Sequence, residues 1–242
     1  MARIGIIGSE GRMGHALARA IEAAGHANAG GVDRGGDVAG LADRSDALVD
    51  FTTPAALEAN LHAAVGAGIP ILIGTTGLGE GHHALIDKAS LAIPVLQTGN
   101  TSLGVTLLAH LVKEAAARLG PEWDVEVLEM HHRMKVDAPS GTALLLGEAA
   151  AEGRGIDFHA PDGPGRYGHT GARERGSIGF ASLRGGTVAG EHSVILAGQQ
   201  ERLILAHSAE DRMIFAHGAV RGAVWLIGQV AGRYAMRQVL GL

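Results

Sequence analysis

The stretch Ile4-Gly-Ile-Ile-Gly-Ser-Glu-Gly-Arg-Met-Gly14 decides the fold of this chain of 242 residues. Its apolar residues 4–7 stop at Gly8, and residues 11–24 then carry apolar side chains at the spacing of an α-helix. We therefore expect a strand, a tight glycine turn and a helix, in that order. A turn of this kind lets backbone N–H groups approach a phosphate at the helix N-terminus.

The same alternation continues through the first hundred residues. One apolar run ends at Asp33, three others cover residues 47–51, 69–73 and 93–96, and helical segments separate them. No two-residue hairpin turn joins these runs, so each connection is expected to be a right-handed crossover between parallel strands. The sequence predicts an α/β fold with a Rossmann-like doubly wound parallel sheet.

The pattern changes after a helix predicted over residues 101–119. Residues 123–130 alternate in polarity, as a strand with one exposed face does, and residues 177–207 contain several more such strands. We expect a second, α+β domain with a mixed sheet. Residues 153–176, rich in Gly, Pro, Asp and Arg, are expected to form a long loop. Residues 211–242 are expected to form a helix that packs on either domain.

The composition limits the function. A net charge of -5 offers no broad positive surface for nucleic acid or an anionic membrane, so any anion site must be local. The absence of cysteine excludes disulfides and thiolate chemistry, and fits a reducing compartment. Residues 1–8 lack the pattern of a signal peptide, and His217 and Arg221 interrupt the apolar segment 214–230, which favours a buried helix over a membrane span. We expect a cytoplasmic protein with no nucleic-acid or membrane partner.

The glycine turn is the first candidate site. Its spacing, Gly-x-x-Gly-x-x-Gly, departs from the common Gly-x-Gly-x-x-Gly, and a turn without a ligand is the competing interpretation. Asp33 follows about 20 residues beyond the turn, at a place where a carboxylate accepts hydrogen bonds from an adenosine ribose. Arg34 can receive a 2′-phosphate, although a solvent-exposed arginine explains the sequence equally well. The pair indicates use of NADH or NADPH.

Two further polar segments follow predicted strands. They are Gly74-Thr75-Thr76-Gly77 and Thr98-Gly99-Asn100-Thr101. Both are expected at the carboxyl ends of parallel strands, where open α/β folds bind ligands. Their hydroxyl and amide groups can bond a nicotinamide or a ribose, but the default role of Thr and Asn at such places is to cap a helix.

A cluster of ionisable side chains follows the alternating strand 123–130. It is His131-His132-Arg133-Met134-Lys135, and a solvated, positively charged strand end is the alternative interpretation. Asp137-Ala-Pro-Ser-Gly-Thr142 then leads into a segment of strong helix propensity, so a capped helix N-terminus that attracts carboxylates is expected nearby. Lys135 adds a positive charge, and one of the histidines can donate a proton near neutral pH. These groups suit the reduction of a small anionic acid.

The two histidines are not expected to act equally. Neighbouring residues on a strand face opposite ways, so His131 and His132 take different roles unless the backbone turns. A metal site is the other use of these side chains, but adjacent histidines chelate poorly and no cysteine is present to complete a tetrahedral set. We expect no metal.

The run Glu129-Met-His-His-Arg-Met-Lys-Val-Asp-Ala-Pro-Ser-Gly-Thr142 closely resembles the signature of the 4-hydroxy-tetrahydrodipicolinate reductase family. The resemblance extends over nearly the whole chain through these segments: residues 8–14, Asp50-Phe-Thr52, Gly74-Thr-Thr-Gly77, Asn100, Gly168-His-Thr-Gly171, Gly176-Ser-Ile-Gly-Phe180, Gly190-Glu-His192 and Phe215-Ala-His-Gly-Ala-Val-Arg221. It implies NAD(P)H-dependent reduction of an unsaturated cyclic hydroxy-diacid, with loss of water, to tetrahydrodipicolinate in lysine and diaminopimelate synthesis.

The resemblance also implies roles for single residues. His131 would be the general acid/base, and Lys135 a proton donor that also holds the substrate. The groups that bind the substrate carboxylates would be His132, Gly141 and Thr142. The residues that hold NADH or NADPH would be Gly8, Ser9, Glu10, Gly11, Arg12, Met13, Asp33, Arg34, Gly74, Thr75, Thr76, Thr98, Gly99, Asn100 and Thr101.

By the same resemblance, residues 1–101 would form a dinucleotide-binding domain completed by a C-terminal helix over residues 212–242. Residues 102–211 would bind the substrate, a small dicarboxylate, and assemble a homotetramer through their sheet. Three departures from the family pattern concern cofactor preference: Ser9-Glu10 where small residues are usual, Thr53 where arginine is frequent, and Thr101 where phenylalanine is common.

Two other functions use the same features. An aspartate or homoserine dehydrogenase also joins a nucleotide domain to a mixed sheet, but it leaves residues 135–142 unexplained. A sensor that binds NAD(P)H without turnover would be expected to carry a DNA-binding helix pair or a basic patch, and neither is seen in the sequence.

Overall fold

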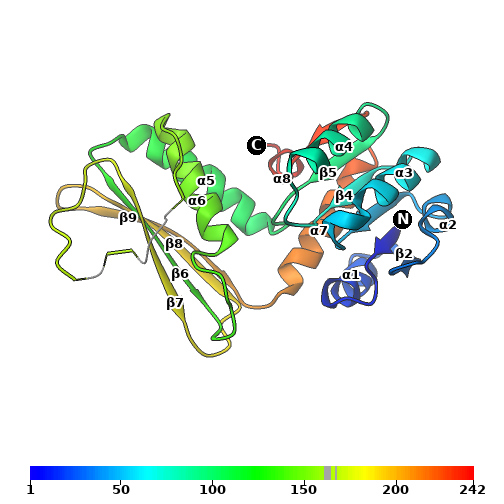
Figure 1. The fold of residues 1–242 in the computed structure, drawn as a ribbon, viewed down its shortest axis with the longest axis horizontal. Coiled ribbons are helices and arrows are strands. Elements are labelled where there is room, and N and C mark those ends of the chain that lie inside the picture. The colour runs from blue at the N-terminus through cyan, green and yellow to red at the C-terminus, as the bar shows by residue number, and fades with distance from the viewer. Residues whose placement is uncertain (161–164, 167) are drawn as a thin grey trace. The chain divides into compact units, whose positions relative to one another are not determined.

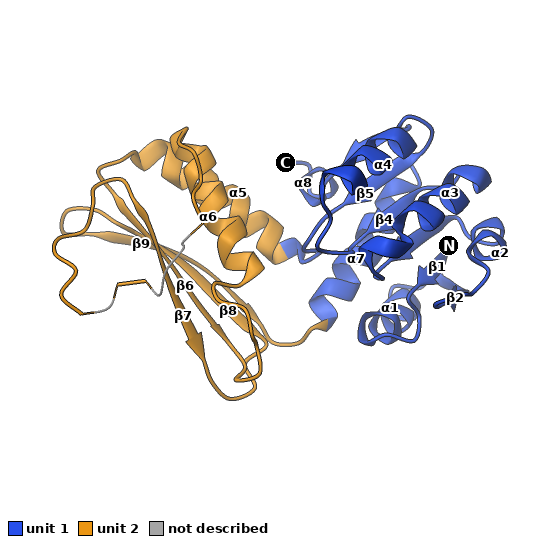
Figure 2. Cartoon of the chain, in the orientation of Figure 1, with its two compact units in different colours: residues 1–103, 213–242 blue, residues 104–212 orange. Residues whose placement is uncertain are grey.

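The computed structural model describes residues 1–160, 165–166 and 168–242. Two compact units make up the chain (Figure 2). Unit 1 contains residues 1–103 and 213–242, and unit 2 contains residues 104–212. The chain thus leaves unit 1, forms unit 2 without interruption, and returns.

The core of unit 1 is a parallel sheet (Figure 1). Its order is β10-β5-β4-β3-β1-β2, and every neighbouring pair is parallel. The strands are β1 (Arg3–Ile7), β2 (Ala27–Val32), β3 (Ala47–Asp50), β4 (Ile71–Ile73), β5 (Pro94–Gln97) and β10 (Gly232–Tyr234). The predicted doubly wound α/β fold is confirmed.

Helices cover both faces of this sheet, which explains why its four inner strands are apolar without alternation. Ile6 and Leu72 pack against α1 (Arg12–Ala23) and α7 (Met213–Leu226) on one face. Ile7 and Ile71 belong to the core of the other face, which α2, α3 and α4 cover. These elements are α2 (Val38–Asp43), the short 3-10 helix η1 (Pro54–Ala56), α3 (Leu57–Ala67) and α4 (Glu80–Ser90).

The C-terminal segment differs from the single helix predicted over residues 212–242. Here α7 ends at Leu226, and β10 and α8 (Met236–Val239) follow it. Gly228 and Gly232 disfavour a continued helix, whereas Val230 and Tyr234 suit extended structure. The edge of β5 decides the outcome, because it supplies backbone partners to β10.

Unit 2 is built on a four-stranded sheet of order β7-β6-β8-β9. Its strands are β6 (Asp124–His131), β7 (Ile178–Arg184), β8 (Gly190–Ala197) and β9 (Arg202–Ala209). β6 and β7 are parallel and the other pairs antiparallel, which confirms the predicted mixed sheet. α5 (Leu103–Leu119) and α6 (Gly141–Arg154) cover one face only (Figure 1).

The connection from α6 to β7 contains the loop predicted over residues 153–176, of which residues 161–164 and 167 lie outside the described residues. Because β6 and β7 are parallel, this connection crosses over with α6 and cannot be a hairpin. Among the described parts of the chain, no helix combines the length and apolar composition that a membrane span requires.

Candidate active site

In unit 1, the glycine turn leaves β1 and enters α1. Gly8 has a φ of +89°, and the N–H groups of Gly8 and Ser9 both donate to Val32 O, at 2.8 and 3.2 Å. A Cβ at Gly14 would overlap the carbonyl groups of Gly8 and Ser9. A Cβ at Gly11 would meet only Gly8 O, at the ordinary contact distance of 3.4 Å. Packing therefore requires glycine at 14, while Gly11 leaves room for a ligand beside the first turn of α1.

Asp33 lies directly beside this turn. Its carboxylate accepts hydrogen bonds from the backbone N–H of Arg34 at 2.9 Å and of Glu10 at 3.2 Å. These two bonds, that of Arg34 first, hold the pKa of Asp33 below its usual range. The structure thus brings together the predicted residues of the turn, which include Arg12 and Met13 in α1, with Asp33 and Arg34 at the end of β2.

Gly74, Thr75 and Thr76 follow β4 at the same carboxyl edge of the sheet. The buried carboxylate of Asp50 braces them, because it accepts bonds from the backbone and hydroxyl of Thr52 and lies 3.4 Å from the Thr75 hydroxyl. Burial raises the pKa of Asp50 despite these bonds. A Cβ at Gly74 would overlap the Phe51 ring. The Thr75 hydroxyl therefore has a structural partner within the protein.

Thr98, Gly99, Asn100 and Thr101 follow β5. The Thr98 hydroxyl donates to Asn100 O at 2.8 Å, and Asn100 Oδ1 accepts from Ser102 N at 2.9 Å. Thr101 is buried and its hydroxyl donates to Phe215 O at 2.7 Å. These side chains bond the loop's own backbone and α7, and so hold the loop in shape.

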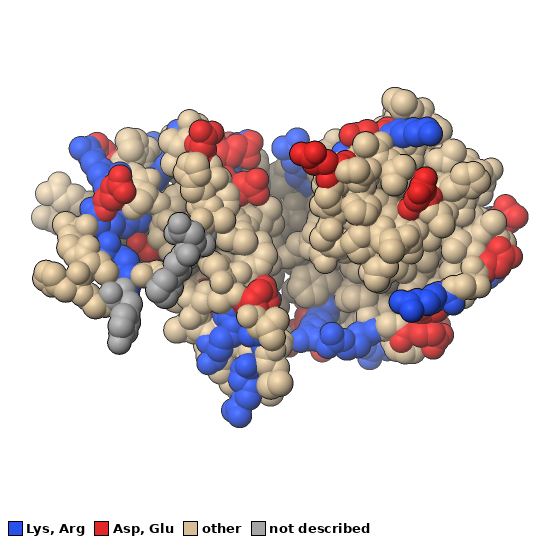
Figure 3. Space-filling view, viewed as in Figure 1, with Lys and Arg blue, Asp and Glu red and all other residues tan. Residues whose placement is uncertain are grey.

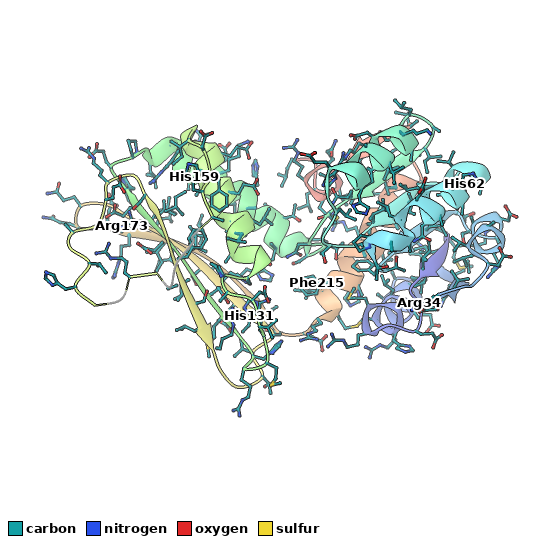
Figure 4. The ribbon with its side chains drawn as sticks, viewed as in Figure 1. Arg34, His62, His131, His159, Arg173 and Phe215 are labelled. Atoms are coloured by element: carbon teal, nitrogen blue, oxygen red, sulfur yellow. The ribbon has the colours of Figure 1, made fainter. Side chains whose placement is uncertain are left out.

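In unit 2, His131 ends β6 and lies on the face of the sheet that the helices cover (Figure 4). Its Nδ1 lies 2.5 Å from Glu129 Oε2, two residues earlier on the same face. Arg184 binds both carboxylate oxygens of Glu129 at 2.8 Å. Burial is the largest single influence on Glu129 and raises its pKa, but hydrogen bonds, chiefly from Arg184, together outweigh burial and lower the pKa to about 2.

The N-terminus of α6 is tied to this pair through Ser140. The Ser140 N–H donates to Glu129 Oε1 at 3.2 Å, and its hydroxyl caps the helix by accepting from Ala143 N. The same hydroxyl lies 3.0 Å from Nε2 of the buried His192. The first hydrogen bond within α6 runs from Leu144 N to Ser140 O. Gly141 and Thr142, which the sequence predicts to bind the substrate, precede Leu144, so their N–H groups lie in the first turn of the helix.

The His192 ring lies edge to face with that of His131, with centroids 5.1 Å apart. Burial, and next the neighbouring His131, lower the pKa of His192 to about 4, so it is neutral near pH 7. Its Nδ1 is buried and has no hydrogen-bond partner among the described atoms, and the same holds for Nδ1 of His207, which faces His192 across the β8/β9 pair.

His132 and Lys135 lie in the loop after β6. His132 Nε2 accepts from Arg212 at 3.0 Å, because arginine has only donors. Lys135 Nζ donates to both carboxylate oxygens of Asp137, at 2.8 and 2.9 Å. His131 and His132 thus take different partners, and only His131 lies on the strand.

Sequence reasoning assigned no role to Glu129, Arg184, His192 or Arg212. Glu129 had a local signal, since it occupies a buried position of the alternation two residues before His131. The other three come from β7, β8 and the end of unit 2, and only the register of the sheet brings the first two beside β6.

The distribution of charged side chains offers no broad positive surface, so an anion site on this protein would be local. Acidic and basic side chains are interspersed over the face that Figure 3 shows. Within the described residues, no three histidine, aspartate or glutamate side chains gather in a group that could hold a metal ion.

The parallel sheet with its glycine turn, together with a second unit that carries a histidine–carboxylate pair and a lysine, defines the class: nicotinamide-dependent oxidoreductases with a Rossmann-like domain. Family models give the particular member. The model of the dihydrodipicolinate reductase N-terminus matches residues 2–101, and that of the C-terminus matches residues 104–240. The chain belongs to the dihydrodipicolinate reductase family.

Its curated relatives carry the name 4-hydroxy-tetrahydrodipicolinate reductase. That of Zymomonas mobilis is 53% identical, over 99% of this chain and 97% of its own length. That of Acidiphilium cryptum is 51% identical over 99% and 98%. Among solved structures, dipicolinate-bound dihydrodipicolinate reductase from Paenisporosarcina sp. TG-14 matches with a TM-score of 0.75 and 21% identity over 97% of each chain. At that identity the structural likeness concerns the fold.

Proposed function

We propose that this chain reduces 4-hydroxy-2,3,4,5-tetrahydrodipicolinate to 2,3,4,5-tetrahydrodipicolinate with loss of water, at the expense of NADH or NADPH. The observation that carries the proposal is the meeting of His131 with an ionised Glu129 next to the N-terminus of α6, in the segment that also holds Lys135. A proton source, a cation and a helix N-terminus are what reduction of a dicarboxylate needs.

The residues of unit 2 take separate tasks. His131, whose ring is largely buried, supplies or removes the proton that balances hydride addition. Lys135 donates to one substrate carboxylate and serves as a second proton source. The N–H groups of Gly141 and Thr142, at the positive end of α6, receive a carboxylate, and His132 adds a further donor.

The residues of unit 1 fit a dinucleotide. The space at Gly11 and the first turn of α1 suit a pyrophosphate, and Asp33 suits a ribose hydroxyl. When bound, the nicotinamide supplies the hydride. The segments 74–76 and 98–101 offer mainly backbone groups, since the hydroxyls of Thr75 and Thr101 have partners within the protein. Arg34 accommodates the 2′-phosphate of NADPH.

A homotetramer is part of the proposal. The face of the unit 2 sheet that α5 and α6 leave open carries the apolar residues Leu128, Met130, Ala181, Leu183, Ile195 and Ile204, with Glu126 and Glu191 on the same face. Leu183 is 50% and Ile204 56% exposed, although both lie on strands. Apolar sheet faces of this kind are buried against another surface. A second copy supplies one by symmetry. A cytoplasmic location, as expected from the sequence, is part of the same proposal.

The decisive experiment couples the condensation product of aspartate semialdehyde and pyruvate to oxidation of NADH or NADPH. We expect turnover by the wild type and a loss of kcat/KM of about 10²- to 10⁴-fold in His131→Ala and Lys135→Ala. The exposed His159 provides a matched control, and His159→Ala should retain wild-type turnover. A wild type that binds NAD(P)H but never oxidises it would be a sensor, and the proposal would be lost.

A further inference from the structure

The carboxylate of Glu129 has hydrogen-bond partners on every side, and the Ser182 side chain, opposite it on β7, is one of them. Oε1 accepts from Arg184 Nη2 and from the Ser140 N–H, and Oε2 accepts from Arg184 Nη1 and lies 2.5 Å from His131 Nδ1. With a pKa of about 2, Glu129 is ionised wherever the enzyme works. An ionised carboxylate only accepts hydrogen bonds, so the hydrogen between the two residues belongs to His131 Nδ1.

This assignment fixes the chemistry of the other ring nitrogen. A neutral imidazole carries one hydrogen, and if that hydrogen is on Nδ1, then Nε2 is left with a lone pair. Gly190 lies on this side of the ring, and a Cβ there would sit 3.1 Å from Nε2 and 3.5 Å from Cδ2. Glycine at 190 therefore leaves the Nε2 edge open.

The charges around the ring favour the same arrangement. Arg184 on β7 neutralises Glu129, and His192 on β8 is uncharged near pH 7. In the loop after β6, Lys135 is paired with Asp137, whose carbonyl oxygen also accepts from Arg184 at 2.6 Å. Of the two neighbouring rings, His131 bonds the Glu129 carboxylate and His192 bonds the Ser140 hydroxyl. The carboxylate therefore acts on the tautomer of His131.

We propose that Glu129 is a positioning residue that holds His131 as the Nδ1–H tautomer, so that Nε2 is the nitrogen that exchanges a proton with the substrate. In the forward step the protonated ring donates the hydrogen on Nε2 to the substrate atom that gains electron density. The ring, cationic before this step, becomes neutral with its Nδ1–H bond intact, and takes the next proton from solvent. This inference rests on the proposed reductase function and adds the tautomer and the residue that sets it.

A purely structural role for Glu129 is the competing explanation, since the same carboxylate anchors Arg184 and the start of α6. The variant Glu129→Gln separates the two. Its amide NH2 at the Oε1 position would face two donors, Arg184 Nη2 and the Ser140 N–H. At the Oε2 position it faces Arg184 Nη1 and His131 Nδ1, and His131 can become an acceptor. The Ser182 hydroxyl, which also bonds this carboxylate, can donate or accept and so selects neither orientation. The two donors at Oε1 therefore favour the amide at Oε2, which drives His131 to the Nε2–H tautomer.

The test uses the full-length protein with ¹⁵N-labelled histidine. Long-range ¹H–¹⁵N spectra distinguish the two neutral tautomers, and His131→Gln identifies the His131 signals among the thirteen histidines. We expect Nδ1–H in the wild type and Nε2–H in Glu129→Gln. Turnover of the variant should fall by about 10²- to 10⁴-fold in kcat, with KM changed by less than about threefold, as expected when a base is held in the wrong tautomer.

Glu152→Gln is the matched control, because it makes the same change in an exposed ion pair with Lys113 on the helices of unit 2. It should leave spectrum and kinetics unchanged. An Nε2–H tautomer in the wild type overturns the proposal, and this measurement needs no variant to fold. An unchanged tautomer in Glu129→Gln, with kcat lost only in proportion to the folded fraction, overturns it as well. If the wild type shows the Nδ1–H tautomer but does not oxidise NAD(P)H, the reductase assignment fails while the pairing of Glu129 with His131 stands.

Discussion

Lys135 Nζ donates to both carboxylate oxygens of Asp137, so the cation proposed to hold the substrate already has an anionic partner. A substrate carboxylate must compete with Asp137 for it. Asp137→Asn removes this competitor and one negative charge, and we expect pyridine-2,6-dicarboxylate to bind about 2- to 10-fold more tightly, measured by calorimetry. Asp46→Asn, which weakens an exposed pair with Arg3 in unit 1, is the control. Weaker binding in Asp137→Asn would show that Asp137 orients Lys135 and does not compete.

Two glycines of the first turn should respond differently to the same substitution. Gly14→Ala places a Cβ onto the carbonyl groups of Gly8 and Ser9, and should reduce the free energy of unfolding by about 1–3 kcal/mol. Gly11→Ala meets no such obstacle and should fold normally, but its methyl group occupies space expected for the pyrophosphate. Urea unfolding and NADH titration of both variants check this. Wild-type NADH affinity in Gly11→Ala would remove the pyrophosphate from this turn.

Arg34 is the expected determinant for the 2′-phosphate. Its backbone N–H binds Asp33, while its exposed side chain lies at the end of β2. Arg34→Ala should weaken NADPH binding about 10- to 100-fold, the value of a charge-assisted bond, and change NADH affinity by less than about twofold. Fluorescence titration of both cofactors measures the ratio, with Lys88→Ala as control. An equal loss for both cofactors would place Arg34 elsewhere on the nucleotide.

Acid should destabilise the protein through His192. Its pKa is about 4 when folded, against an ordinary 6.5, so between these values the unfolded chain binds the extra proton and stability rises with pH. Acidification from pH 6.5 to 5 should therefore cost roughly 2 kcal/mol at this residue. His192→Gln keeps a group that can bond Ser140 and should lack this part of the pH dependence in urea unfolding. The exposed His62 is the control, and identical pH dependence in wild type and His192→Gln would contradict the assignment.

The open face of the unit 2 sheet should hold the copies together. Leu183→Lys or Ile204→Lys places a charge on this face, and either should shift the mass in light scattering from about four chains to fewer. Leu91→Lys makes the same change at an exposed leucine of unit 1, where no effect is expected. A tetramer that survives both sheet variants must assemble through another surface.

The sequence predicts those features that local patterns decide. The glycine turn, the strand before it and the helix after it follow from spacing within residues 4–24, and Asp33 follows from its distance to the turn. A helix cap at Ser140 or a nearby residue is predicted because the helix propensity of residues 143–150 marks a helix start. These features depend on backbone geometry that neighbouring residues impose.

Other features depend on partners distant in the chain. Arg184 reaches Glu129 only because β7 pairs with β6 in parallel, 55 residues later. β10 is a strand because β5 offers an open edge, although much of its surrounding sequence is helical. The hydroxyl of Thr101 is engaged by Phe215 O from α7, which no nearby residue indicates. Register and long-range packing decide these contacts, and a single sequence does not display them.

The return of the chain to unit 1 has a consequence for the order of folding during synthesis. All of unit 2 has been made once residue 212 is added, whereas unit 1 still lacks α7 and β10. Until α7 arrives, the side of β3, β4 and β5 that it covers stays exposed, with Val49, Leu72 and Leu96 on it. The unit that begins first on the ribosome is thus the last to be completed. In the interval its bare strands are the part of the nascent chain most exposed to aggregation.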